Sequence, residues 1–176
     1  ELILADRNVW TGNLGFDVYS DRVNSTRSDK DLSTGMEVQK RGLYPDDSHM
    51  SSMAVFMVHQ LMYRKWILTA GARINSFLID VPGEASERTR ISPLAMVGNA
   101  GVLRKLTARL DWMGSVNTGF RAPNIDDLGS LGIVDFRFEV PNPGLKPERT
   151  FQLQTGIRYN SSRFRGETYI YRTGLY

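Results

Sequence analysis

The feature that most constrains this chain is a series of long segments in which apolar and polar residues alternate. Within residues 9–23, Leu14 and Phe16 alternate with Asn13 and Asp17. A period of two residues over this length predicts a β-strand with one apolar face and one polar face. Comparable segments are expected at residues 51–63, 66–80, 91–103, 106–119, 151–159 and from Arg163 onward. At about 12–15 residues, most of them are at least twice as long as a usual strand of about 5–6 residues.

The connections between these segments alternate between short and long. Short connections are predicted at Asp6–Asn8, Arg64-Lys65, Arg104-Lys105 and Asn160–Ser162, and long ones at residues 24–50, 81–90 and 120–147. Because antiparallel neighbours place successive connections at opposite ends, one end of the sheet carries tight turns and the other carries large loops. This arrangement is typical of an outer-membrane β-barrel. A soluble β-sandwich would show the same alternation of faces, but it does not require such long strands.

The aromatic residues support a membrane boundary near the short connections. Tyr and Trp favour the membrane–water interface, where the ring is half buried and the polar atom is hydrated. Trp112 is expected nearer the middle of its segment and falls outside this pattern. The residues that lie within a few positions of a short connection are Trp10, Tyr63, Trp66, Tyr159 and Phe164.

Composition excludes several classes of protein. The mean hydropathy is −0.31, and no apolar run approaches the roughly 20 residues that a membrane-spanning helix requires. The 22 basic and 19 acidic residues are scattered and nearly balanced, which argues against a nucleic-acid partner. The absence of cysteine excludes disulfides, thiol catalysis and cysteine metal sites. Because the chain ends within an alternating segment, residues 1–176 are expected to be an internal fragment of a barrel domain.

Polar residues on the alternating segments are the first candidates for a functional surface. In a barrel they would line the lumen, either as a solvated wall or as contacts for a passing ligand. Neither His49 nor His59 has a second histidine at metal-binding spacing, and no catalytic motif is present. We therefore expect no enzyme, no metal site and no resident cofactor. The residues predicted to face the lumen are Asp17, Asp21, Arg73, Arg109, Asp111, Gln152, Gln154, Arg158 and Glu167.

The longest loop carries two motifs that resemble those of a known family. The sequences NTGFRAP at 117–123 and NPGLKPE at 142–148 are similar to the paired FRAP and NPNL boxes of TonB-dependent outer-membrane receptors. GLYPDDS and LTAGARIN also look like barrel segments of that family. The box residues are candidates either for structural corners of the loop or for ligand contact. They are Phe120, Arg121, Ala122, Pro123, Asn142, Pro143, Leu145, Lys146, Pro147 and Glu148.

The resemblance implies an all-β, up-and-down antiparallel meander within a transmembrane barrel of 22 strands, closed by an N-terminal plug that precedes this chain. It also implies the bacterial outer membrane and active import of a small extracellular ligand, energised by the TonB–ExbB–ExbD complex. Siderophores, haem, vitamins and glycans are the ligand classes. The absence of histidine from residues 124–141, and Gly144 in place of the second asparagine, count against haem. A passive porin, an adhesin or a structural barrel in the same membrane is the alternative. We expect apolar side chains on the convex side of the meander and no core on its concave side.

Overall fold

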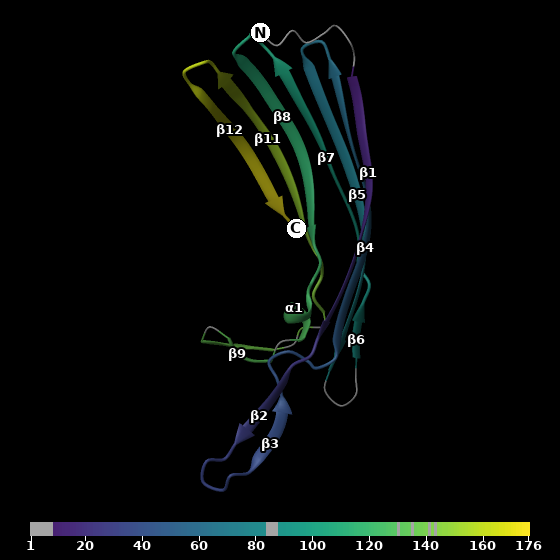
Figure 1. The fold of residues 1–176 in the computed structure, drawn as a ribbon, viewed down its shortest axis with the longest axis vertical. Coiled ribbons are helices and arrows are strands. Elements are labelled where there is room, and N and C mark those ends of the chain that lie inside the picture. Colours follow the sequence, from purple (N-terminus) through teal and green to yellow (C-terminus); the bar gives the residue numbers. More distant parts are fainter. Residues whose placement is uncertain (1–8, 84–87, 130, 135, 141, 143) are drawn as a thin grey trace.

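The computed structural model describes residues 9–83, 88–129, 131–134, 136–140, 142 and 144–176. The expected turn at Asp6–Asn8 lies outside these residues. Within the described part of the chain, no helix is long and apolar enough to cross a membrane. One large, strongly curved antiparallel sheet dominates (Figure 1). Its strands pair in sequence order, so the expected antiparallel meander is confirmed.

Long strands make up this sheet, with lengths from 11 to 17 residues. At about 3.3 Å per residue, the 15 residues of the first strand extend about 50 Å, and a tilt of about 40° leaves about 38 Å along the membrane normal. This exceeds the apolar band of about 25 Å that a membrane barrel presents. The strands in pairing order are β1 (Val9–Val23), β4 (Ser48–Tyr63), β5 (Trp66–Pro82), β7 (Leu94–Lys105), β8 (Leu110–Arg121), β11 (Glu148–Asn160) and β12 (Arg165–Leu175).

Tight turns and large loops separate to opposite ends of the sheet, as the sequence predicts. The turns between β4 and β5, β7 and β8, and β11 and β12 lie together at the end drawn uppermost in Figure 1. The opposite end carries β2 (Thr26–Lys30), β3 (Glu37–Arg41), β6 (Arg88–Ile91), α1 (Ile125–Gly129), β9 (Gly132–Val134) and β10 (Arg137–Glu139). We call these the turn end and the loop end. Strands β2 and β3 form one hairpin and β9 and β10 another, while β6 pairs with β5.

The two-residue connection expected at Arg104-Lys105 is wrong. Strand β7 continues to Lys105, and the turn occupies residues 106–109. The hydroxyl of Thr107 accepts hydrogen bonds from the backbone N–H groups of Arg109 (3.2 Å) and Leu110 (3.0 Å), which closes the turn. Leu110 is therefore the first residue of β8. Trp112 accordingly lies close to the turn end, among the aromatic residues that mark the membrane boundary, although the sequence pattern placed it outside that group.

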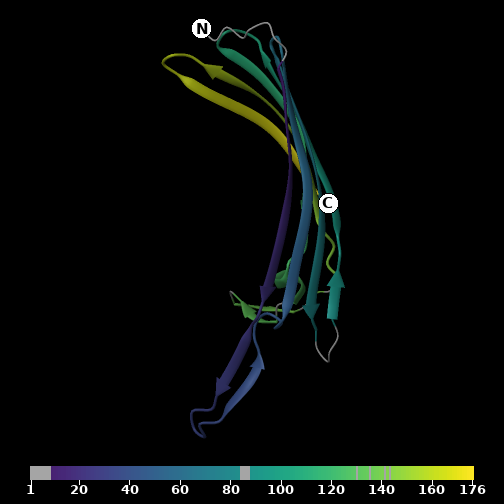
Figure 2. The ribbon, with the colours of Figure 1, turned by 45° about the vertical axis from the view of Figure 1, so that its right-hand side comes forward.

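The register separates the two faces of the sheet. Leu14 pairs with Met57 and Phe16 with Val55, so one face carries a continuous layer of apolar side chains. Leu14 and Phe16 are 79% and 77% exposed, because no described part of the chain covers them. Figure 2 shows the curvature: α1 and β9 lie on the concave side of the sheet. The apolar layer lies on the other, convex side, as expected for a surface that faces lipid.

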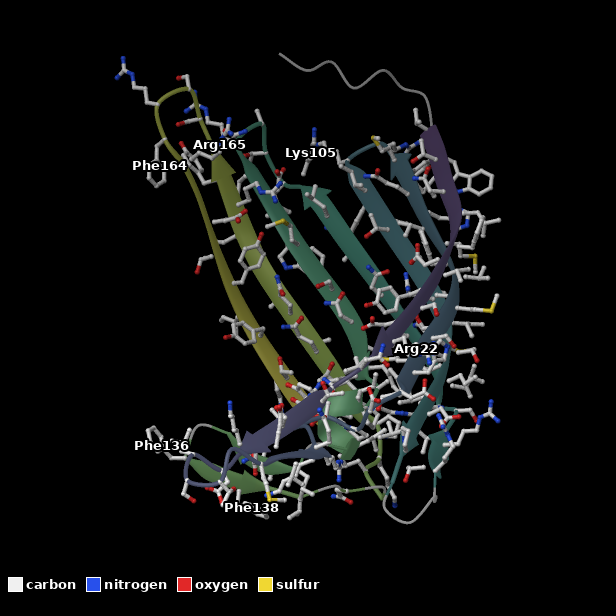
Figure 3. The ribbon with its side chains drawn as sticks, turned by 60° about the horizontal axis from the view of Figure 1, so that its bottom comes forward. Arg22, Lys105, Phe136, Phe138, Phe164 and Arg165 are labelled. Atoms are coloured by element: carbon white, nitrogen blue, oxygen red, sulfur yellow. The ribbon has the colours of Figure 1, made fainter. Side chains whose placement is uncertain are left out.

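The boundary aromatics cluster with cations at the turn end. The guanidinium of Arg104 lies 4.8 Å from the ring centre of Trp66, and that of Arg64 lies 5.3 Å from Tyr63. Figure 3 shows Lys105, Phe164 and Arg165 at the same end. Aromatic rings with cations at this level are typical of a membrane–water interface.

Candidate functional site

A small apolar core fixes the loop end to the concave face of the sheet. Ile79 and Val81 of β5 are buried against Ile125 and Leu128 of α1, and Leu145 packs on the edge of this cluster. The two β5 residues share a face with Arg73, since strand side chains alternate. The expectation that no core lies on the concave side is therefore wrong at the loop end. The core anchors the FRAP-like segment beside the NPNL-like segment.

Arg121 joins the two boxes. It is the last residue of β8 and lies opposite Glu148, the first residue of β11. Its Nη1 lies 3.6 Å from Glu148 Oε1, and its Nη2 donates to both carboxylate oxygens of Asp127 at 3.0 and 3.1 Å. The guanidinium thus bridges the end of the strand pair and the first turn of α1. Each of these exposed ion pairs contributes at most about 1 kcal/mol, so the contribution of Arg121 is chiefly positional.

The start of α1 is held by a reciprocal pair of hydrogen bonds. The side chain of Asn124 accepts the N–H of Asp127 at 2.7 Å, and the carboxylate of Asp127 accepts the N–H of Asn124 at 3.1 Å. This arrangement is a capping box, which satisfies two backbone donors that a helix start leaves open. Asp127 therefore caps the helix and binds Arg121 at the same time.

Residues from both boxes line one hollow of about 70 Å³. A hollow of this size has room for water, and it is well below the roughly 300 Å³ at which small-molecule sites begin. Lys146 is exposed at its rim and makes no ion pair within the described residues. The lining residues are Arg121, Ala122, Pro123, Asp127, Leu145, Lys146 and Glu148.

The remaining box residues hold the segments around this hollow in place. The ring of Phe120 stacks on Phe77 of β5, with 5.8 Å between the ring centres. The side chain of Asn142 accepts the N–H of Gly144 at 3.2 Å, which shapes the approach to β11. Pro147 is half buried, and Pro143 lies outside the described residues. Glu148 contacts Arg121 across the strand pair.

The concave face carries most of the predicted lumen residues. Asp17 and Arg73 form an ion pair of 2.6 Å, and Arg73 also donates to Asn75 at 2.6 Å. Arg158 pairs with Glu167 at 3.2 Å, and Glu167 accepts a hydrogen bond from Tyr169 at 3.1 Å.

The other predicted lumen residues follow the register. In the strand register, Asp111 lies opposite Arg158, Gln152 opposite Asn117 and Gln154 opposite Ser115. Asp21 shares the face of Asp17, four residues away on β1. Arg109 is the exception, because it lies in the turn after β7. The alternation continues through that turn, which is why the sequence assigned Arg109 to a strand face.

Carboxylates gather beside α1. Burial raises the pKa of Asp126, and the nearby negative charges of Glu139 and Asp127 raise it further. The described residues contain no group of three or more His, Asp or Glu side chains arranged to hold a metal. His49 lies near the loop end of β4, whereas His59 lies on the convex face and stacks on Trp10 with 5.4 Å between ring centres.

The sequence comparison decides the family. A profile described as "TonB dependent receptor-like, beta-barrel" matches residues 2–173. The chain belongs to this family of TonB-dependent receptors. Members of the family reside in the Gram-negative outer membrane, so the predicted localisation holds. No curated protein matches this receptor chain by sequence.

Solved structures share the fold of this receptor chain. The copper transporter OprC superposes with a TM-score of 0.77 at 15% identity, covering 94% of this chain and 27% of that one. A double mutant of the Serratia marcescens hemophore receptor HasR, in complex with its hemophore HasA and heme, superposes with a TM-score of 0.74 at 15% identity. The match covers 98% of this chain and 31% of that one. The FrpB iron transporter from Neisseria meningitidis (F3-3 variant) superposes with a TM-score of 0.57 at 19% identity, and the match covers 74% of this chain and 19% of that one. The chain therefore spans less than a third of each of these proteins.

Proposed function

We propose that the full receptor imports a small extracellular ligand across the outer membrane, energised by the TonB–ExbB–ExbD complex. The observation that carries this proposal is the loop end, where Arg121 links the two family boxes above a wall of polar side chains on the concave face. A passive porin needs a polar wall but has no need of this bridge. In the proposed protein the chain forms part of a 22-stranded barrel around an N-terminal plug.

The boxes act as structural corners of the loop in this proposal. The guanidinium of Arg121 is already directed at two carboxylates, Asp127 and Glu148. The ammonium of Lys146 is the better candidate for contact with an anionic group on the ligand, because it is exposed at the rim of the hollow. We therefore assign Arg121 to positioning and Lys146 to ligand contact.

The ligand class that fits best is a metal carried by an anionic organic chelator, as in a siderophore. The described residues offer no protein metal site, so the metal would arrive already coordinated. The structural neighbours handle copper, iron and haem, which favours metal-related cargo. Residues 124–141 contain no histidine, which disfavours haem.

Uptake of radiolabelled ferric chelators by cells that express the full-length receptor tests this function. We expect accumulation in a strain with a working TonB complex and none in a strain that lacks TonB. Accumulation that is equal in both strains would favour the passive porin. Lys146→Gln should raise the apparent ligand KM, whereas Arg121→Gln should expose the 120–148 loop to protease. If Lys146→Gln leaves uptake unchanged, the assigned contact is wrong although the import function stands.

A further inference from the structure

A hollow lies in the apolar layer of the convex face. The hollow measures about 580 Å³, within the range of about 300–1,000 Å³ that small-molecule sites occupy. Side chains from four neighbouring strands, β7, β8, β11 and β12, form it. The residues that contribute convex-face side chains, or an open backbone position, are Ala100, Val102, Trp112, Gly114, Val116, Leu153, Thr155, Ile170 and Arg172.

Small residues form the floor of this hollow, which we call the convex groove. Ala100 lies opposite Val116 and Gly114 lies opposite Val102 in the register, so the space left by the two small residues runs diagonally across two adjacent strands. A Cβ built on Gly114 would lie 3.4 Å from the ring of Trp112. The indole therefore lies along the strand rather than standing away from it, and it forms the turn-end wall of the groove.

The polar atoms of the groove wall are satisfied within the chain. The indole N–H of Trp112 donates to the hydroxyl of Thr155 at 3.0 Å, and that hydroxyl donates to the carbonyl of Met113 at 3.1 Å. Neither group is left to require water. Most of the groove surface is thus suited to a hydrocarbon chain.

Arg172 is the charge on this otherwise apolar wall. It pairs in register with Leu153 of β11, so its side chain leaves the sheet on the convex side. It is exposed and has no hydrogen bond or ion pair within the described residues. An arginine on the lipid face of a barrel is unfavourable unless its guanidinium reaches the headgroup level. Arg172 lies seven residues beyond the start of β12, on the loop-end side of the groove.

We propose that the convex groove binds one acyl chain of an anionic membrane lipid and that Arg172 binds the lipid's phosphate. The position of Arg172 places this headgroup in the leaflet on the loop side. Arginine is suited to this role because its planar guanidinium forms paired hydrogen bonds with phosphate oxygens. The proposal requires only that the convex face meets the bilayer, so it does not depend on the imported ligand.

Quenching of Trp112 by brominated acyl chains tests the site in the full-length receptor. The receptor is reconstituted into vesicles of phosphatidylcholine that contain either brominated phosphatidylglycerol or brominated phosphatidylcholine as a minor component. The signal of Trp112 is the difference between the receptor and its Trp112→Phe variant. We expect the anionic lipid to be enriched roughly five-fold, equivalent to about 1 kcal/mol for one basic residue at an anionic lipid surface.

Variants separate the charge from the groove. Arg172→Gln should abolish the preference for the anionic lipid, and Arg172→Lys should retain part of it. Arg165→Gln is the matched control, because Arg165 lies on the same strand, faces the concave side and donates to Asn160. Ala100→Leu should reduce quenching by both lipids, because it fills the groove. Native mass spectrometry of the same variants, counting lipids that survive detergent exchange, gives a second measurement.

Two results would overturn the proposal. Equal quenching by the two lipids in the unmodified receptor would mean that Arg172 selects no headgroup. A preference that survives Arg172→Gln would mean that Arg172 pairs elsewhere, for instance with a carboxylate on a strand beside the free edge of β12. The shift of the folded barrel on unheated gels confirms that each variant has folded before its lipid binding is judged.

Discussion

The assignment of faces predicts opposite outcomes for two adjacent residues of β8. Val116 lies on the convex face, six residues beyond Leu110 at the turn end. Six residues extend about 20 Å along the strand and about 15 Å along the membrane normal, which is close to the middle of a band of about 25 Å. Val116→Arg should therefore cost about 2–4 kcal/mol. Asn117→Arg should lower the free energy of unfolding by only about 1 kcal/mol, because residue 117 faces the lumen. The substitution removes one side-chain hydrogen bond, which the Asn117 amide makes to Gln152 or to Ser115.

Leu110→Arg supplies the depth control for this comparison. Leu110 shares the convex face with Val116 but lies beside the turn, where an added charge should cost only about 0–1 kcal/mol. The assay is reversible denaturant unfolding of the full-length barrel in lipid vesicles, followed by tryptophan fluorescence. Equal losses of unfolding free energy for Val116→Arg and Asn117→Arg would refute the face assignment. A loss for Leu110→Arg as large as for Val116→Arg would refute the position of the turn.

Three further predictions concern the ends of the sheet. Gly35 lies in the β2–β3 turn, where a Cβ built on it meets no atom within 4 Å. An epitope tag inserted there should therefore bind antibody on intact cells. A tag at Arg64-Lys65 should bind antibody only after permeabilisation. Leu128→Ala should destabilise the loop-end core by about 2–5 kcal/mol, detected as faster proteolysis of the 120–148 loop, with the exposed Leu32→Ala as a silent control. Hydrogen bonds from the Ser33 hydroxyl, the Ser33 N–H and Thr34 lower the pKa of Asp31 to about 2 from its ordinary 3.8. The β2–β3 turn should therefore keep this stabilisation above about pH 4 and lose it as pH falls through about 2, measured by carboxyl NMR titration with Asp31→Asn as reference.

The long strands could be predicted from sequence because burial on one face imposes a strict period of two. Strand β1 begins and ends within the predicted segment, and the faces of β5 are those that its alternation indicates. The turn after β7 was misplaced for the same reason. Leu106 and Ala108 continue the alternation through a turn that Thr107 closes by side-chain hydrogen bonds. Periodicity alone cannot distinguish a short turn that preserves parity from an uninterrupted strand.

The β2–β3 hairpin has no apolar face and gave no period to detect. Its pairing is supported by charge, since Asp29 of β2 contacts Lys40 of β3 at 2.7 Å. Asp29 also contacts Arg27 of its own strand at 2.8 Å. Those side-chain contacts lower the pKa of Asp29, with Lys40 the larger cause. Such a hairpin depends on cross-strand ion pairs and turn chemistry rather than on burial.

Helix α1 was missed because five residues are too few to display a helical period. The spacing of Asn124 and Asp127 is that of a capping box, and this was the signal in the sequence that could have located the helix.

The geometry of the two boxes follows from where the membrane band ends. The strands are longer than the band requires, so Arg121 and Glu148 lie beyond it, where the strand pair opens into a loop of 26 residues, 122–147. Ordering and closing a loop of that length costs conformational entropy, and local hydrogen bonds alone do not offset this cost. The buried contacts of Ile125 and Leu128 with β5 offset part of this cost, and the Arg121–Asp127 pair fixes the orientation of α1. One arginine can bridge both boxes only if they lie at the same level, and the register provides this by pairing Arg121 directly with Glu148. The boxes are therefore better explained as the anchorage of the loop than as its ligand-binding surface, and a ligand would be met by side chains that this anchorage leaves free, Lys146 among them.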